Sequence, residues 1–307
     1  DLDRRLRSRA PADVEGLPRF WGGAVGYFGY DVVRQIERLP DPPENDLGLP
    51  DGLFLFTDIV VAIDNLKGRA MAIAAVPVDD LTTDEQLRLA YDEAVERTEK
   101  IVRRLDENPP PGALALTGEP EQDPPFESSM SREQYEAGVE TIRDYIRAGD
   151  AFQVVLSQRL GFSLEASPFD LYRALRSLNP SPYLYFLEVD GVTLVGCSPE
   201  VLVRVEDGTV TVRPIAGTRP RGRTPEEEQA LAEDLLADEK ELAEHRMLVD
   251  LGRNDVGRVA EYGSVTVPDL MVVERYSHVM HIVSQVEGQV IEGLGAVDVF
   301  KACFPAG

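Results

Sequence analysis

Cysteine and lysine are scarce in this sequence of 307 residues, and long apolar runs are missing. The two cysteines, Cys197 and Cys303, are too few for a disulfide framework, which favours a reduced protein. No apolar run approaches the roughly 20 residues of a membrane-spanning helix. The first ten residues, DLDRRLRSRA, lack the apolar core of a signal peptide. These absences predict a globular protein of the cytoplasm.

Positive charge is also scarce. The formal net charge is −24, and the only lysines are Lys67, Lys100, Lys240 and Lys301. Such an excess of acid argues against nucleic acid and acidic membranes as general partners. An acidic surface that is poor in lysine fits either a salty cytoplasm or a GC-rich genome, and the sequence does not separate the two.

The length fits one large domain or two ordinary ones. A Pro- and Gly-rich stretch at 108–126, NPPPGALALTGEPEQDPPF, is the best candidate for a linker. It would separate an N-terminal region, 1–107, from a larger C-terminal domain, 127–307. The sequence has no initiator Met and stops just after an apolar segment, so we expect a piece of a longer protein, truncated at both ends.

Strands punctuated by single helices predict an α+β fold with mainly antiparallel sheet. Capping boxes begin at Thr83 and Ser131, and Pro follows Ser167 and Thr224, which marks four helix starts. The predicted helices cover 83–108, 132–147, 167–179 and a stretch that begins at 224. The predicted strands cover 53–64, 69–76, 152–164, 183–189, 192–197, 201–206, 209–215, 264–273 and 276–290.

Glycines recur among aromatic residues at 21–31, WGGAVGYFGYD. No Gly-Lys-Ser/Thr follows them and no GxGxxG opens a helix, so a phosphate-binding loop is disfavoured. We expect Gly23, Gly26 and Gly29 to allow close packing of backbone and aromatic rings.

Helical periodicity without proline extends over 234–258, DLLADEKELAEHRMLVDLGRNDVGR. Glu241, Glu244, His245 and Leu248 fall on one stripe of this predicted helix, between apolar ridges. Burying two carboxylates there is costly unless a cation compensates their charge. The stripe is therefore either half of a metal site with oxygen ligands or a helix face with an ordinary Glu241–His245 contact. Spacing alone favours the second interpretation.

Arginines are concentrated around residues 214–222, PIAGTRPRG, in an otherwise acidic chain. Arg213, Arg219, Arg221 and Arg223 beside glycines suggest an anion pocket, and the backbone at Gly217 could approach a ligand closely. A surface hairpin loop whose charges have no function explains the pattern equally well.

Two further polar positions are weaker candidates. His278 and His281 are three residues apart, so on a strand at most one of them faces a given site. Glu200 follows Ser198-Pro199 at a strand boundary, where a rigid turn could aim its carboxyl group.

The motifs taken together resemble one enzyme family. PIAGTRPRG, DEKELAEHRMLVDLGRNDVGR, RYSHVMHIVSQVEG and ACFPAG, with WGGAVGYFGYD, AGDAFQVVLSQR, NPSPYLYFLE and GCSPE, are similar to the chorismate-utilising enzymes, and among them to the component I chains of anthranilate synthases. The resemblance extends from Phe20 almost to the end. It implies an α+β fold of two large, packed, mainly antiparallel β-sheets with helices on the outside, incomplete here, and makes 127–307 the chorismate-binding catalytic domain without its C-terminal part.

The resemblance also implies roles for individual residues. Glu244 matches a direct Mg²⁺ ligand, and Glu241 matches a carboxylate that assists through water. Gly217 and Thr218 match the loop that binds chorismate. Glu200 matches the general acid for departure of the C4 hydroxyl, for which burial should raise its pKa, and His281 matches the active-site histidine. Three residues match part of a feedback site for tryptophan, in which many relatives have Met at the last position: Pro182, Tyr183 and Leu184.

Two positions distinguish members of the family. Relatives that add water carry Lys in place of Gln153, and relatives that aminate at C4 commonly carry Lys in place of Ala216. The absence of both lysines favours ammonia as the nucleophile, unless Gln153 and Ala216 are simply packing residues.

The implied reaction is Mg²⁺-dependent amination of chorismate at C2 and elimination of pyruvate to give anthranilate, the first step of tryptophan biosynthesis. A glutamine amidotransferase partner would supply the ammonia. The alternatives are an aminodeoxychorismate or aminodeoxyisochorismate synthase, and a non-catalytic chain that docks an amidotransferase. The family's remaining metal-binding glutamates would lie beyond Gly307, which leaves the activity of this polypeptide open.

Overall fold

A computed structural model of the chain describes residues 2–8, 12, 14–79, 82–109, 111–114 and 124–306. The helices are α1 Leu2–Arg7, the 3₁₀ helix η1 Tyr30–Gln35, α2 Asp84–Glu107, α3 Arg132–Ala148, α4 Pro168–Leu178, α5 Pro225–Ala237, α6 Glu239–Gly257 and α7 Ala296–Cys303. The strands are β1 Gly23–Phe28, β2 Gly52–Thr57, β3 Ile59–Asp64, β4 Arg69–Ala74, β5 Glu127–Ser128, β6 Leu160–Gly161, β7 Tyr183–Val189, β8 Val192–Ser198, β9 Arg204–Glu206, β10 Thr209–Val212, β11 Ile215–Pro220, β12 Thr266–Arg275 and β13 Val279–Gln289.

Strand β13 is the centre of the largest sheet. Strands β10 and β11 pair with successive halves of β13, and β12 pairs with β13 independently; β9 extends the sheet beyond β10. The remaining strands form the two-stranded ladders β1–β2, β3–β4, β5–β6 and β7–β8. Every pairing between these strands is antiparallel. The predicted α+β class with antiparallel sheet is confirmed.

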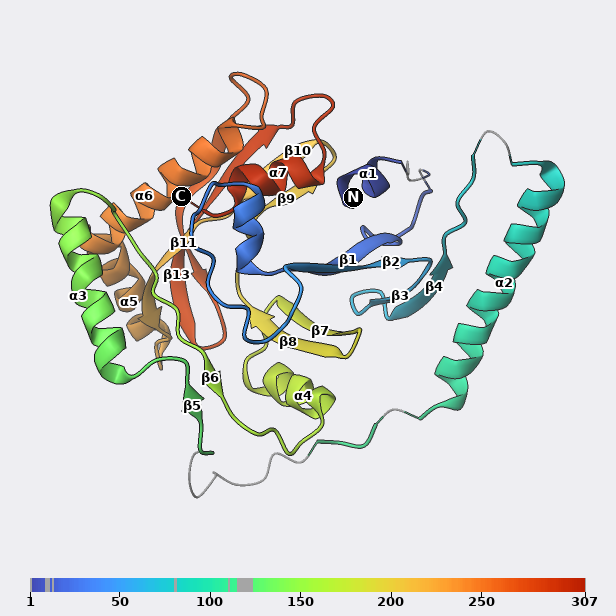
Figure 1. The fold of residues 1–307 in the computed structure, drawn as a ribbon, viewed down its shortest axis with the longest axis horizontal. Helices are drawn as coiled ribbons and strands as arrows, with labels where there is room; N and C mark the ends of the chain where they lie inside the picture. The colour runs from blue at the N-terminus through green and yellow to red at the C-terminus, as the bar shows by residue number, and fades with distance from the viewer. Residues whose placement is uncertain are drawn as a thin grey trace.

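Helices α5 and α6 pack on the large sheet through β11 and β13. Figure 1 shows α2 at the opposite end of the molecule, beyond the β3–β4 ladder that it contacts. The core between α6, α7 and the sheet contains Val210, Val249, Val256 and Val286. A second cluster, under α5, contains Leu235, Met280 and Ile282, all fully buried. The rigid part of the molecule is therefore the five-stranded sheet with its covering helices.

Most local predictions from capping and turn residues are confirmed. Capping boxes start α2 at Thr83 and α3 at Ser131, and Pro in the first turn follows the N-caps of α4 and α5. The predicted hairpins are β3–β4 and β7–β8. Gly26 lies where an added Cβ would be 1.9 Å from the Leu53 carbonyl oxygen, so the expected close packing is confirmed at this glycine.

Several predicted boundaries are wrong. The strand predicted at 53–64 is two strands, β2 and β3, because the chain changes ladder at Asp58. The run at 209–215 is likewise divided into β10 and β11, and the strand at 201–206 is reduced to β9. The helix over 234–258 is interrupted at Asp238. That residue is extended, with ψ of 106°, and its side chain accepts hydrogen bonds from the backbone amides of Lys240 and Glu241. A capping aspartate thus ends α5 and starts α6.

The strand predicted at 152–164 is largely absent. Only Leu160–Gly161 pairs, with β5, and residues 152–159 belong to no ladder. Phe152 and Val155 are 87% and 86% exposed, so the apolar pattern is present without a partner strand in the described chain. The predicted linker at 108–126 falls largely on residues 110 and 115–123, outside the described residues. Within the described parts of the chain, no helix combines the length and apolarity that crossing a membrane requires.

Candidate functional site

Strand β11 bends where the candidate site lies. Its register against β13 shifts between Ala216 and Thr218, and Gly217 has a φ of +71°. An ideal Cβ at Gly217 would lie 3.3 Å from Glu241 Oε2 and 3.1 Å from Leu235 Cδ1. A side chain there would be strained by the backbone and crowded by its neighbours. The glycine therefore lets the strand approach the Glu241 carboxylate.

His281 lies on β13 directly opposite Thr218. Its Nδ1 is 2.9 Å from the Gly217 carbonyl oxygen and 3.1 Å from Thr218 Oγ1. A carbonyl oxygen can only accept, so Nδ1 carries the proton and donates it to Gly217. In the neutral ring, Nε2 is then the basic nitrogen. Since His278 is exposed and bonds with Ser277 instead, only one of the two histidines belongs to the site.

Helix α6 is fixed to the sheet by a buried histidine. His245 is fully buried, and its Nε2 is 2.7 Å from Ser284 Oγ on β13. The same hydroxyl accepts the backbone amide of Met271 on β12 at 2.9 Å. Burial lowers the pKa of His245, which favours the neutral ring. The expected Glu241–His245 contact is replaced by this bond to the sheet, which sets the rotation of α6 so that Glu241 faces β11.

Glu241 and Glu244 of α6 are both half-buried. Glu241 lies against Gly217, as described above. The Glu244 carboxylate accepts a hydrogen bond from Gln153 Nε2 at 3.2 Å. Gln153 is exposed and comes from the unpaired segment 152–159, far away in the sequence. Ala216, the other specificity position, is 8% exposed and pairs with Ile282 in the sheet. The structure therefore brings Gln153 to Glu244 and keeps Ala216 in the adjoining strand.

Glu200 follows strand β8 and lies near His281 and the Ile215 amide. Burial of its carboxyl group raises the pKa of Glu200, although the residue as a whole is exposed. The Ile215 amide and the charge of His281 act in the opposite direction without cancelling the effect. The predicted direction of the pKa shift is confirmed. A carboxyl group with a raised pKa retains its proton to higher pH and can donate it.

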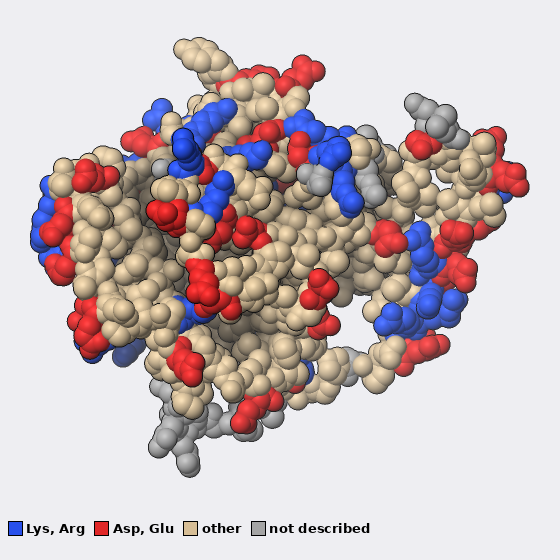
Figure 2. All heavy atoms as spheres, in the orientation of Figure 1, with Lys and Arg blue, Asp and Glu red and all other residues tan. Residues whose placement is uncertain are grey.

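Three of the four arginines of the predicted anion pocket, Arg213, Arg219 and Arg221, are bound to carboxylates and do not form an open pocket. Arg219 binds Asp234 at 2.6 Å and Asp238 at 2.9 Å, and Arg221 binds Glu228 at 2.7 Å. Arg213 pairs with Glu274. Figure 2 shows basic and acidic side chains interspersed over the face of the molecule that is turned toward the viewer in Figure 1. These guanidinium groups hold β11 against α5 and β12. The spacing of residues in the sequence could not show these ion pairs, because the carboxylates lie elsewhere along the chain.

The first strand of the β7–β8 hairpin begins at the residues expected to bind tryptophan. Tyr183 pairs with Ser198, and Leu184 pairs with Cys197. Pro182 immediately precedes the strand. The Tyr183 phenol is close enough to Tyr276 to raise the pKa of that phenol, so this hairpin end lies near the site. Sequence reasoning did not identify Tyr276 or Ser284, because neither stands in a motif that predicts its partner.

The donor set suits magnesium better than a metal held by protein alone. Among the described residues, no three His, Cys, Asp or Glu side chains form a metal-binding group. Mg²⁺ usually keeps several waters and is bound by one or two carboxylates together with oxygens of the substrate. Glu244 and Glu241, half-buried beside a glycine that admits close approach, fit this pattern.

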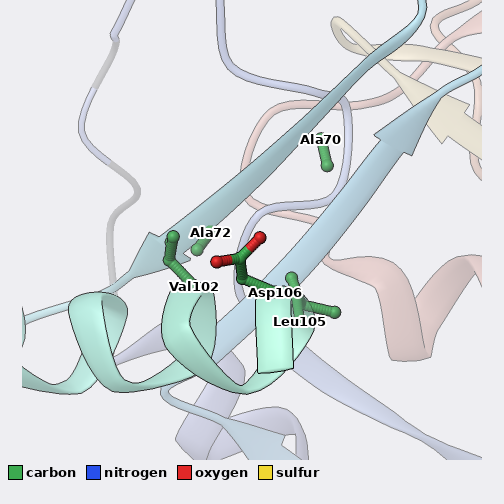
Figure 3. A pocket seen from close by; sticks show the side chains of 5 residues that line it. All are labelled: Ala70, Ala72, Val102, Leu105 and Asp106. Atoms are coloured by element: carbon green, nitrogen blue, oxygen red, sulfur yellow. The ribbon is translucent and has the colours of Figure 1, made fainter. Parts of the chain in front are cut away.

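A separate hollow lies between β4 and α2. It has a volume of about 330 Å³ and is lined by Ala70, Ala72, Val102, Leu105 and Asp106. Figure 3 shows the Asp106 carboxylate among these apolar side chains. None of the predicted site residues lines this hollow, so we do not assign it to the site.

Comparison with known proteins is consistent with this geometry. A family model for chorismate binding enzymes matches residues 2–307. The chain is 54% identical to anthranilate synthase component 1 of Pseudomonas putida over 299 residues, which is 96% of this chain and 59% of the relative. It is also 54% identical to anthranilate synthase component 1 of Pseudomonas aeruginosa, over 99% of this chain and 61% of the relative. The chain thus spans about three fifths of the length of these curated relatives.

The fold agrees with a solved structure of the same kind. Anthranilate synthase component I from Streptococcus pneumoniae superposes with a TM-score of 0.84 and 39% sequence identity. The match covers 100% of this chain and 66% of that chain.

Proposed function

The chain belongs to the chorismate binding enzymes, and we propose that it is the part of an anthranilate synthase component I that holds chorismate for amination at C2. The observation that carries this proposal is the convergence of Gly217, Thr218 and His281 with Glu241 of α6, at hydrogen-bond or contact distance. Glu200 and Glu244 border the same place. The overall reaction converts chorismate and ammonia into anthranilate, pyruvate and water.

Glu200 is assigned the role of the general acid. Its raised pKa keeps a proton available, and that proton converts the departing C4 hydroxyl into water as the C2–N bond forms. The enolpyruvyl C–O bond then breaks, and the ring loses its C2 proton and becomes aromatic. His281 presents Nε2 as the basic nitrogen, because Nδ1 is engaged by Gly217. The backbone at Gly217 and the Thr218 hydroxyl would orient the substrate.

The identity of the nucleophile follows from Gln153 and Ala216, which have neither a nucleophilic nor a basic side chain. Neither side chain can attack the ring or deprotonate water, so ammonia from outside is the best candidate. The Gln153 amide is already engaged with Glu244. We assign the supply of ammonia to a glutamine amidotransferase partner, as the resemblance implies. The same resemblance assigns Pro182, Tyr183 and Leu184 to feedback inhibition by tryptophan.

Glu244 would hold Mg²⁺ directly, and Glu241 would hold it through water. When bound, the ion would neutralise the ring carboxylate of chorismate and favour charge build-up during amination. Without the ion, the carboxylates of Glu241, Glu244 and chorismate would lie close together, and their mutual repulsion would disfavour binding of the substrate. The two glutamates therefore make substrate binding depend on the cation.

Product analysis tests this function. The full-length protein would be incubated with chorismate, ammonium and Mg²⁺, and the products would be separated by liquid chromatography. We expect anthranilate and pyruvate in equal amounts. Aminodeoxychorismate, detected as p-aminobenzoate after a lyase is added, would overturn the C2 assignment. Isochorismate would overturn the choice of ammonia over water.

A further inference from the structure

Tyr276 lies in the turn between β12 and β13 and contacts the imidazole of His281. The two rings meet edge to face, with centroids 5.5 Å apart and planes at 65°. This is a favourable arrangement for an aromatic pair. One side of the His281 ring is therefore in contact with a ring that the proposed chemistry does not use.

The tyrosine is itself fixed at three points. Its hydroxyl donates to Glu274 Oε2 at 2.9 Å. Its backbone amide donates to the Val279 carbonyl at 2.8 Å, and its own carbonyl accepts from Arg221 Nη1 at 2.5 Å. The ring consequently has little freedom to move away from His281.

Glu274 is in turn held by a cation. Its other oxygen, Oε1, is paired with Arg213, which lies just before β11. The result is a chain of contacts from Arg213 through Glu274 and Tyr276 to His281. Burial and the Glu274 carboxylate raise the pKa of Tyr276 to about 12, so the phenol stays protonated and remains a donor at neutral pH.

The hydrogen bond to Gly217 alone does not fix the His281 ring. The Gly217 carbonyl and the Thr218 hydroxyl both contact Nδ1, so they hold one atom of the ring and still let the ring tilt about it, which would move Nε2. Packing of the Tyr276 ring against the imidazole restricts that tilt. Small errors in the placement of a catalytic group cost much of its effect. A fixed tyrosine would therefore aim Nε2 at one point of the site.

We infer that Tyr276, held by Glu274 and Arg213, is a positioning residue for His281. This inference rests on the proposed function only in that it takes His281 to act in catalysis. The contact between the two rings does not depend on that function. A purely structural tyrosine, which serves only to close the turn, is the competing explanation.

Substitution at Tyr276 in the full-length protein separates the two explanations. Tyr276→Leu removes the ring, and Tyr276→Phe keeps the ring but removes the bond to Glu274. We expect kcat to fall about 30-fold in Tyr276→Leu and about 3-fold in Tyr276→Phe, with KM for chorismate within about 2-fold of wild type. Tyr262→Phe is the matched control, because Tyr262 is fully exposed, and its kcat should not change.

Nitrogen-15 NMR of the imidazoles gives a readout that does not require activity. A spectrum of a His281→Gln variant assigns the signals of His281. In wild type they should report a proton on Nδ1, held by the Gly217 carbonyl, and in Tyr276→Leu they should change because the ring samples a range of tilts. Wild-type kcat and an unchanged His281 spectrum in Tyr276→Leu would overturn the inference. If anthranilate is not made but the spectrum changes as expected, the proposed function fails and the positioning role stands.

Discussion

The region around β13 and the region of two-stranded ladders are built on different principles. Among the residues that the structure describes, eighteen hydrophobic side chains are buried: three of them, Val32, Val33 and Ala94, lie in the first 200 residues, and the other fifteen lie between Val210 and Cys303. The ladders β3–β4 and β7–β8 instead expose large side chains such as Ile63, at 70%, and Tyr185, at 51%. One region is held by a shared core and the other by local pairing.

The candidate site follows this division. Gly217, Thr218 and His281 lie on β11 and β13 of the large sheet. Glu241 and Glu244 lie on α6, which packs against these strands. Outside that region, Gln153 reaches Glu244 from the segment 152–159, which has no strand partner, and Glu200 follows β8 of a two-stranded ladder. The residues proposed to hold the substrate and the metal therefore lie on the large sheet and α6, whereas Gln153 and the proposed acid Glu200 come from the part of the chain with few buried residues.

The largest effect is expected from removing a charge at the centre of the rigid region. Glu244→Gln keeps the size of the side chain but removes the proposed Mg²⁺ ligand, so turnover with chorismate should fall at least about 100-fold. Steady-state rates over a range of Mg²⁺ concentrations measure this fall in turnover. Glu239→Gln, on an exposed position of the same helix, is the control and should retain activity. Equal activity of Glu244→Gln and wild type would remove the metal assignment.

The difference in packing between the regions can be measured directly. Met280→Ala on β13 removes a fully buried side chain, and the free energy of unfolding should fall by about 2–5 kcal/mol. Ile63→Ala on β3 removes a side chain that is 70% exposed, and the change should stay within about 0.5 kcal/mol. Urea denaturation of both variants gives the comparison. Similar losses at the two positions would mean that the ladder region also has a cooperative core.

Local chemistry in the sequence was a good guide where one residue decides the structure. The capping boxes at Thr83 and Ser131 place α2 and α3 correctly, since a side chain that satisfies free amides acts within one turn. The family resemblance also predicts one site from Glu241, Glu244, Gly217, Thr218 and His281, and their roles remain predictions. Their convergence was an implication of that resemblance, which the observed contacts now support.

The failures arise where structure depends on a distant partner. The apolar alternation at 152–164 is typical of a strand, yet a strand forms only where another edge pairs with it. Neither the Ser284 partner of His245 nor the carboxylate partners of Arg219 are close in sequence to the residues they bind. A pattern of single residues cannot show which of many acids will neutralise an arginine, so the anion pocket looked plausible and was wrong.

A smaller effect is expected from the contact that joins the two regions. Gln153→Ala removes the amide that donates to Glu244, so apparent Mg²⁺ affinity should weaken about 10-fold while stability stays unchanged. Gln158→Ala is a matched control from the same part of the chain, because that side chain binds Ser128 instead. Calorimetric titration with Mg²⁺ in the presence of chorismate measures the affinity. If both variants behave like wild type, Gln153 has no part in holding Glu244.

The smallest effect concerns a buried acid at the end of α6, away from the site. Asp255 is 4% exposed, and one of its carboxylate oxygens has no hydrogen-bond partner among the described residues. Burial raises the pKa of Asp255, and this outweighs the opposing charge of Arg258. A raised folded-state pKa means that the contribution of this group to stability is present below its unfolded pKa and is lost as pH rises through the folded pKa.

Asp255→Asn does not titrate and therefore escapes that loss. Its melting temperature should exceed that of wild type by a few degrees at neutral pH, and the difference should shrink as pH is lowered below the pKa of the unfolded aspartate. Thermal melts from pH 4 to 8 measure the trend, with Asp250→Asn, exposed on the same helix, as the control. A gain of the same size at every pH would show that packing, and not the buried charge, distinguishes the variant. A lower melting temperature of Asp255→Asn at neutral pH would show that Arg258 stabilises the Asp255 carboxylate. The charged form would then be favoured in the folded protein in spite of its burial.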